Sequence, residues 1–283
     1  MNSGYTEKKP RLWPSLVIAL ITLPVIGLVA TLTINIIVGQ SSDPGIQITD
    51  EIINLWMQQN MTTAKGFLSI LIPIHLAMLI IALVAARFSR TPIKQRLGLV
   101  RGLLPLWQYP IVMFGAVGAS ALAGWLFLAH IAPGEDEMAM ALAFTQTTGW
   151  NGAIIALYAA IVASFTEELL FRGFVLRGLL RRLNPFIAIV MVAVLFSLTH
   201  PSPFFMAAAF LPGVWFGIVL WRTQSVWPAL ACHSFGNIAL ALLNRWYPEP
   251  TVAFFGELTL LPIAVGIFGV VMMGVSIKLL FRK

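Results

Sequence analysis

Two adjacent carboxylates, Glu167 and Glu168, lie in a stretch that otherwise has the character of a membrane helix, AIIALYAAIVASFTEELLFRGF, and Arg172 follows. A charged side chain in hydrocarbon costs about 2.5 to 3.5 kcal/mol on insertion scales, so such groups are retained for a function or are neutralised by a partner. On a helix Glu168 and Arg172 share a face, whereas Glu167 is turned about 100° away. We therefore expect a structural Glu168–Arg172 ion pair and a working Glu167.

Two further polar motifs follow in the same half of the chain. Phe196-Ser-Leu-Thr-His200 ends an apolar run, and the Phe196 ring lies one helical turn before His200, where it can fix the imidazole and exclude lipid. His233-Ser-Phe-Gly-Asn237 lies inside a later apolar run, with its histidine and asparagine on one helix face. The three patterns E-E-x-x-x-R, F-x-x-x-H and H-x-x-x-N, in this order, are a much more specific signal than any one of them.

These motifs resemble those of the CAAX prenyl protease and bacteriocin-processing (CPBP, Abi) family of intramembrane proteases. The resemblance runs from about Thr166 to Asn237, and all three motifs are intact. It implies an all-helical endopeptidase whose site is enclosed among membrane helices. The expected substrate is a membrane-associated peptide or protein, and a prenylated tail, a leader peptide and a segment of a membrane protein all stay open. The residues that the resemblance places in the lining of the site are Glu167, His200, His233 and Asn237, with Glu168 and Arg172 in support.

The chemistry of peptide hydrolysis fits these side chains. The reaction needs an activated water, a group that returns a proton to the leaving amine, and donors aimed at the developing oxyanion. Glu167 suits the base and later the acid, and His200 can hold the water. His233 and Asn237 can donate hydrogen bonds to the oxyanion.

A divalent metal is an alternative that the sequence leaves open. Glu167, His200 and His233 would form a set of two imidazoles and one carboxylate with a free position for water, as catalytic zinc requires. The compact zinc motif HExxH is absent from the chain. The single cysteine, Cys232, excludes an internal disulfide and a cysteine-built zinc site. No cofactor is therefore certain, and zinc is the expected ion if one binds.

Other function classes compete with the protease. A proton-coupled transporter would also bury carboxylates and histidines, but we would expect internal repeats and polar groups in both halves of the chain. A catalytically silent scaffold or immunity-type relative would not need the complete motif set. A cysteine protease built on Cys232 and His233 is disfavoured because neighbours on a helix point about 100° apart. His75 and His130 are expected to be packed, hydrogen-bonded residues.

The composition is that of an integral membrane protein. Of the 283 residues, 59% are hydrophobic and 10% are charged, against about 25% charged in soluble domains. The net charge of +7 does not indicate nucleic acid, because the basic residues lie between apolar runs and not on a soluble face. The lipid bilayer and a substrate within it are the expected partners, and the oligomeric state is left open.

A polytopic all-α bundle is expected, because a span needs about 20 mostly apolar residues and several such runs occur. Eight candidate spans cover residues 15–39, 66–86, 108–131, 152–171, 186–200, 204–222, 226–244 and 258–279. With the N-terminus inside, 16 of the 18 Lys and Arg residues lie in inner segments, and Lys65 and Arg245 do not. This asymmetry predicts that both termini are cytoplasmic, in the plasma membrane if the protein is bacterial.

His233 follows the preceding connection closely, so we expect the sixth helix to be short, tilted or broken at Pro212.

The expected organisation has one polytopic domain in four parts. They are a cytoplasmic segment 1–14, N-terminal transmembrane helices 15–150, a catalytic core 151–245, and a C-terminal transmembrane helix and tail 246–283. The first apolar run is longer than the 7 to 15 residues, roughly, of a signal-peptide core, so it is expected to be retained. Small residues on one face of a helix predict close packing against another helix and no catalytic role. In the third span they are Gly115, Ala119 and Ala123, and in the sixth they are Gly213 and Gly217.

Overall fold

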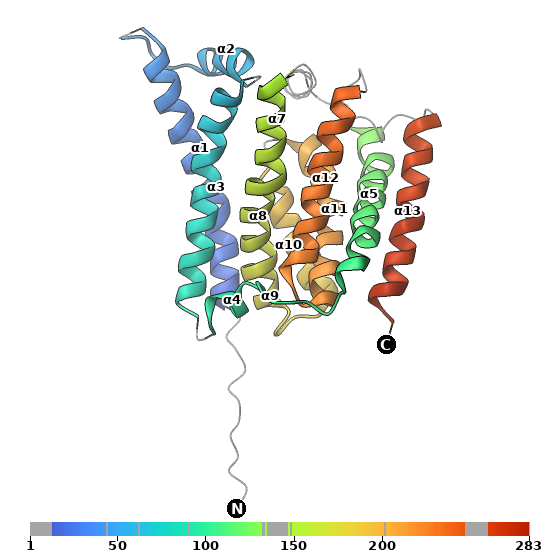
Figure 1. Ribbon diagram of the computed structural model, residues 1–283. Coiled ribbons are helices and arrows are strands. Elements are labelled where there is room, and N and C mark those ends of the chain that lie inside the picture. Colours follow the sequence, from blue (N-terminus) through green and yellow to red (C-terminus); the bar gives the residue numbers. More distant parts are fainter. Residues whose placement is uncertain are drawn as a thin grey trace, which may run out of the picture.

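The chain forms a bundle of long helices that run in alternating directions, as the computed structural model shows (Figure 1). The residues that the structure describes are 13–43, 45–61, 63–89, 91–131, 134, 147, 149–200, 202–246 and 260–282. Most of the expected cytoplasmic segment 1–14 therefore lies outside them. The helices are α1 (Trp13–Ser41), α2 (Asp50–Asn60), α3 (Ala64–Arg87), α4 (Ile93–Arg96), η1 (Leu106–Gln108), α5 (Tyr109–Leu126), η2 (Leu128–His130), α7 (Gly149–Leu157), η3 (Tyr158–Ala163), α8 (Ser164–Glu167), η4 (Glu168–Leu176), α9 (Arg177–Leu179), α10 (Pro185–Ser197), α11 (Pro203–Thr223), α12 (Val226–Trp246) and α13 (Leu260–Leu280).

The all-α polytopic fold predicted from the sequence is confirmed, since each of the eight expected spans contains a helix. Within the described residues, six helices are long and apolar enough to cross a membrane, one of them continuous from α7 through α9. The apolar helix α10 and the apolar part of α12, Val226–Leu242, are shorter. The bundle thus combines long apolar helices with two shorter apolar stretches.

The segment η4 lies at the centre of the bundle. Each of its residues is buried, and α1, α3, α10, α11 and α12 all contact it. Lipid tails are as apolar as the side chains of Phe171 and Phe174, so the stability of this centre comes from close packing and not from removal of apolar surface from water. Polar side chains on η4 and the preceding turn are thereby held away from lipid.

The end of α10 differs from the expected span 186–200. The helix begins at Pro185, where the Asn184 side chain accepts a hydrogen bond from the Phe186 amide, and it ends at Ser197. The physical reason lies in the sequence, because a residue that precedes proline disfavours helical geometry and His200 precedes Pro201. His200 therefore lies on a turn just beyond the helix.

The expectation of a short or broken sixth helix was wrong, because α11 runs without interruption through Pro212. His233 reaches the depth of the site for another reason. In the turn between α11 and α12 Ser225 is 0% and Val226 is 1% exposed, although Gln224 is exposed, so the start of α12 has one side packed against the bundle. The Val226 amide donates to the Gly98 carbonyl at 3.0 Å, so the segment before α5 covers this turn.

A buried arginine fastens the same covering segment to η4. Arg96 is 4% exposed, and its Nη1 donates to the Phe174 carbonyl at 2.9 Å while its Nη2 donates to the Ser15 hydroxyl at 3.2 Å. Burial, together with the nearby Arg181 and Arg177, lowers the pKa of Arg96 to about 10. The guanidinium is still protonated at neutral pH, so α1, α4 and η4 are joined by charge-assisted hydrogen bonds.

The small residues of α5 and α11 make the helix contacts that the sequence predicted. A side chain at Gly115 would meet the Trp215 ring at 2.5 Å, and one at Gly217 would meet Ile189 at 2.9 Å. Gly213 has more than a packing role, because its carbonyl accepts a hydrogen bond from Arg172 at 2.9 Å. The absence of a side chain there lets α11 approach the charged centre of η4.

Candidate active site

The two carboxylates lie at a change in helix geometry. The α-helical turn α8, which ends at Glu167, separates the π-helical segments η3 and η4, and Glu168 is the first residue of η4. The Ser164 hydroxyl, at the start of α8, donates to the Ala159 carbonyl of η3 at 3.0 Å and so adds a side-chain donor to the widened turn. Because π-helical turns are rare and occur frequently at functional sites, this geometry independently marks the region.

Glu168 and Arg172 form the expected ion pair, with 3.0 Å between Oε1 and Nη1. Their side chains are 1% and 0% exposed. The guanidinium also donates to the Gly213 carbonyl and lies 4.4 Å from the centre of the Phe196 ring. Phe196 therefore supports the arginine as well as a histidine, which the sequence pattern had not indicated.

His233 links the ion pair to the second carboxylate. Its Nδ1 lies 3.0 Å from Glu168 Oε1, and its Nε2 lies 3.7 Å from Glu167 Oε2. A carboxylate paired with arginine only accepts hydrogen bonds, so Nδ1 carries the donated proton. The imidazole is stacked on Phe216 with 4.9 Å between ring centres. Glu168 and Phe216 thus fix the orientation of the ring and direct Nε2 toward Glu167.

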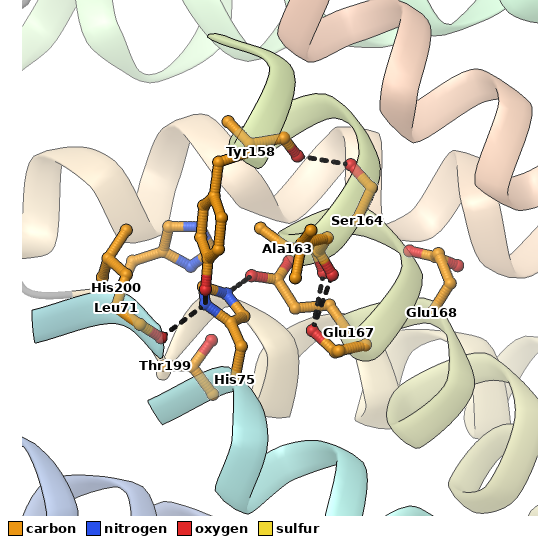
Figure 2. A network of polar contacts seen from close by, with 12 residues as sticks. Leu71, His75, Tyr158, Ala163, Ser164, Glu167, Glu168, Thr199 and His200 are labelled. Carbon is orange, nitrogen blue, oxygen red and sulfur yellow. Dashed lines mark hydrogen bonds and ion pairs between the residues drawn. The ribbon is translucent and has the colours of Figure 1, made fainter. Parts of the chain in front are cut away.

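Glu167 points to a different side of the helix from Glu168 and meets His75 of α3 (Figure 2). The distance between His75 Nε2 and Glu167 Oε1 is 3.2 Å. The Glu167 side chain is 15% exposed, whereas that of Glu168 is 1% exposed. Only the first carboxylate therefore has surface that another molecule can contact.

The sequence analysis missed the part that His75 plays here. His75 is buried and hydrogen-bonded as expected, but its partner is the carboxylate proposed to do the chemistry. A buried histidine in a span must find a polar partner, and that requirement was the available signal. The expectation for His130 was wrong, because this residue is exposed in η2 at the end of a span.

His200 completes the group of imidazoles around Glu167. Its Nδ1 lies 3.2 Å from the Phe196 carbonyl, and its ring packs edge-on against the Phe196 ring with 5.2 Å between centres. A carbonyl only accepts, so Nδ1 is the protonated nitrogen of the neutral ring and Nε2 is an acceptor. Glu167 interacts electrostatically with His75, His200 and His233.

Asn237 lies one turn beyond His233 and faces the π-helical segment. Its Nδ2 donates to the Ala159 carbonyl and to the Ser164 hydroxyl, both at 3.0 Å. These two bonds use both N–H groups of the amide. Asn237 therefore ties α12 to η3, and it would have to exchange one of these partners in order to donate to an oxyanion.

Comparison with known families matches the segment that carries this geometry. Residues 149–239 fit the family model described as Rce1-like, type II CAAX prenyl endopeptidase Rce1-like. This match covers about a third of the chain, and over these residues the chain is similar to the type II CAAX prenyl endopeptidases. The matched segment contains all three motifs, whereas His75 lies outside it. Comparison with curated proteins and with solved structures gives no match.

A metal ion bound in the matched segment would need a set of ligands that the described side chains do not form as they lie. Among the residues that the structure describes, no three or more His, Cys, Asp and Glu side chains are grouped so that they could hold a metal ion. Glu167 Oε1 is engaged by His75, and His233 Nδ1 is engaged by Glu168. The zinc set of Glu167, His200 and His233 stays a prediction, and no step below depends on it.

Proposed function

We propose that the protein is an intramembrane endopeptidase of the CAAX protease type that hydrolyses a peptide bond of a membrane-associated substrate. The observation that carries the proposal is the environment of Glu167. It is the accessible member of the carboxylate pair, and its Oε2 faces His233 Nε2 at 3.7 Å. The family match of residues 149–239 supports the same reaction class.

The proposed reaction begins with a water molecule activated by Glu167. A separation of 3.7 Å is too long for a good direct hydrogen bond, but one water molecule can contact both Glu167 Oε2 and His233 Nε2. Glu167 accepts a proton from this water as the oxygen attacks the scissile carbonyl, and it then returns the proton to the leaving amine. His200 holds the same water by accepting the water's second hydrogen bond at Nε2, in the state in which His233 carries a second proton and donates to the water from Nε2.

Stabilisation of the oxyanion is assigned to the α12 side of the site. His233 Nδ1 already donates to Glu168, so its Nε2 donates to an oxyanion only when the ring carries a second proton. Asn237 contributes by holding η3 in place, and by direct donation once one of its two bonds to η3 is released. One well-placed donor to an oxyanion contributes about 10²- to 10³-fold to turnover in other acyl-transfer enzymes.

The experiment that tests the function compares membranes that contain the active protein with membranes that contain Glu167→Ala. Quantitative proteomics of polypeptide termini should reveal at least one membrane-associated species that is cleaved only with the active protein. A matched pair of synthetic peptides, one prenylated and one not, then distinguishes a prenylated tail from a leader-type substrate. Identical termini in both membranes would favour the catalytically silent relative.

A further inference from the structure

The contact that no motif predicted is the one between Glu167 and His75 of α3. The two residues are 92 positions apart, and His75 is 5% exposed. Its Nε2 lies 3.2 Å from Glu167 Oε1, while its Nδ1 lies 2.9 Å from the Leu71 carbonyl and 3.0 Å from the Tyr158 hydroxyl. Both ring nitrogens are thus engaged, one of them with a carboxylate that the proposed reaction uses (Figure 2).

The partners of His75 fix which oxygen of Glu167 is available. A backbone carbonyl only accepts, so Nδ1 carries a proton and shares it between Leu71 and Tyr158. For Glu167 to act as the base it must be a carboxylate, so the proton in the 3.2 Å contact between Nε2 and Oε1 is carried by Nε2. Oε1 of Glu167 is therefore occupied, and Oε2 is the oxygen that faces His233.

The surroundings of the imidazole keep it in this orientation. Tyr158 packs edge-on against the His75 ring with 5.5 Å between ring centres, and Phe67 packs edge-on against Tyr158 at 6.4 Å. Tyr158 is the first residue of η3, in the same continuous helix as Glu167. The carboxylate, the imidazole and the hydroxyl therefore close a ring of contacts between α3 and the helix that bears Glu167.

We propose that His75 is a positioning residue for Glu167, and that Tyr158 and Leu71 hold the imidazole in the orientation that this role requires. The inference rests on the proposed function, because it concerns the same carboxylate. By anchoring Oε1, His75 removes rotation of the carboxylate and presents Oε2 to the water and to His233. A misplacement of about 1 Å in a catalytic group can cost on the order of 10²-fold in rate, so this anchor is expected to affect turnover and not substrate binding.

The test uses the full-length protein in detergent or nanodiscs, with any peptide that it cleaves. His75→Leu keeps an apolar side chain of moderate size and removes both hydrogen-bonding nitrogens. It should lower kcat by roughly 10- to 100-fold with little change in KM. His75→Gln can place an amide N–H near the position of Nε2 and should restore part of the loss. Tyr158→Phe should have a smaller effect, and His130→Leu, on an exposed histidine, should have none.

Three results would overturn the inference. One is wild-type kcat in His75→Leu. Another is a decrease in kcat in His75→Leu that is proportional to its decrease in folded protein and that His75→Gln does not relieve. The third needs no activity: His75→Leu and Glu167→Gln should shift the midpoint of thermal unfolding non-additively, and additive shifts would show that the contact is absent. If Glu167→Gln still cleaves the peptide, Glu167 is not the general base. The thermal unfolding of the single and double variants would still show whether the His75–Glu167 contact exists.

Discussion

The two neighbouring carboxylates have the same chemistry and different surroundings, and the surroundings assign their roles. Glu168 shares its Oε1 between Arg172 and His233, and its side chain is 1% exposed. Glu167 is 15% exposed and is held by an imidazole of a different helix. A structural charge and a reacting charge can therefore occupy consecutive positions, because one helical step turns them about 100° apart.

Conservative substitutions should separate these roles. Glu167→Gln keeps the shape and leaves the Glu168–Arg172 pair intact, so the protein should fold while turnover falls by roughly 10²- to 10⁴-fold through loss of the general base. Glu168→Gln leaves a buried guanidinium without its counter-charge, which should cost on the order of 3 to 5 kcal/mol and lower the folded yield. Thermal unfolding in detergent and peptide cleavage measure the two effects.

The contrary outcomes for this pair are specific. An active Glu167→Gln together with a folded but inactive Glu168→Gln would reverse the assignment. Normal cleavage by both variants would remove the protease interpretation. Because Glu168 also accepts from His233 Nδ1, some loss of turnover in the folded fraction of Glu168→Gln is expected and does not by itself reverse it.

Any bound metal should depend on the same imidazoles. We expect that zinc found at stoichiometric levels in purified protein is held by Glu167, His200 and His233. It should therefore be lost from the double variant His200→Ala with His233→Ala. Elemental analysis of both proteins after equal purification measures this, with His130→Ala as the matched control on an exposed histidine. Zinc that survives the double substitution would exclude these ligands.

At the residue scale, local contacts follow from the sequence and distant ones do not. The Glu168–Arg172 pair is a consequence of helical spacing, and so is the contact between Phe196 and His200. The bond between His75 and Glu167 joins residues 92 positions apart, and spacing has no information on which helices become neighbours. Helical spacing correctly predicted that Asn237 shares a face with His233. Its partners, Ala159 and Ser164, lie at a π-helical turn that no spacing rule indicates.

At the scale of elements, hydropathy located the helices and local chemistry decided where they end. The runs of about 20 apolar residues predicted eight helices in the right order. The early end of α10 instead depends on Pro201, which follows His200 in the sequence. The position at which α12 starts depends on the segment before α5, which packs on the α11–α12 turn. The helix α2 was not predicted, because its mixed sequence DEIINLWMQQN has no apolar run of spanning length.

The contact between α5 and α13 should depend on two glycines. A side chain at Gly118 would lie 2.3 Å from the Gly269 carbonyl oxygen, and one at Gly269 would lie 2.5 Å from the Gly118 amide nitrogen. Gly118→Ala or Gly269→Ala must therefore separate two backbones, with an expected cost of about 1 to 3 kcal/mol. Thermal unfolding of the purified protein measures this cost.

The same helix offers a matched control for that substitution. Gly274 of α13 has no atom within 4 Å of an added side chain, so Gly274→Ala should change stability by less than about 0.5 kcal/mol. Equal effects of Gly269→Ala and Gly274→Ala would mean that the substitutions act through helix propensity and that α13 does not pack on α5 in this register.

At the scale of the whole molecule, the path of the chain agrees with the distribution of charge. The helix α1 begins and α13 ends at the same end of the bundle, where α4 and α9 also lie (Figure 1). Arg96, Arg177 and Arg181 belong to or adjoin these helices and interact with one another electrostatically. The start of α1 and the end of α13 therefore lie on one side of the bundle, as an even number of crossings would require.

The orientation of this bundle in the membrane is the remaining prediction. Of the 18 Lys and Arg residues, 16 fall in segments that the order of apolar runs in the sequence assigns to one side, and the positive-inside rule predicts that this side is cytoplasmic. Reporter fusions after Arg101 and after Lys283 should therefore both give a cytoplasmic signal, whereas a fusion after Lys65 should give an external one. The helix α10 makes this a demanding test, because its 13 residues are only about 20 Å long and its neighbours assign it to a crossing. An external signal after Lys283 with a cytoplasmic signal after Arg101 would mean that an odd number of crossings follows α4, and that α10 or α12 does not traverse the bilayer.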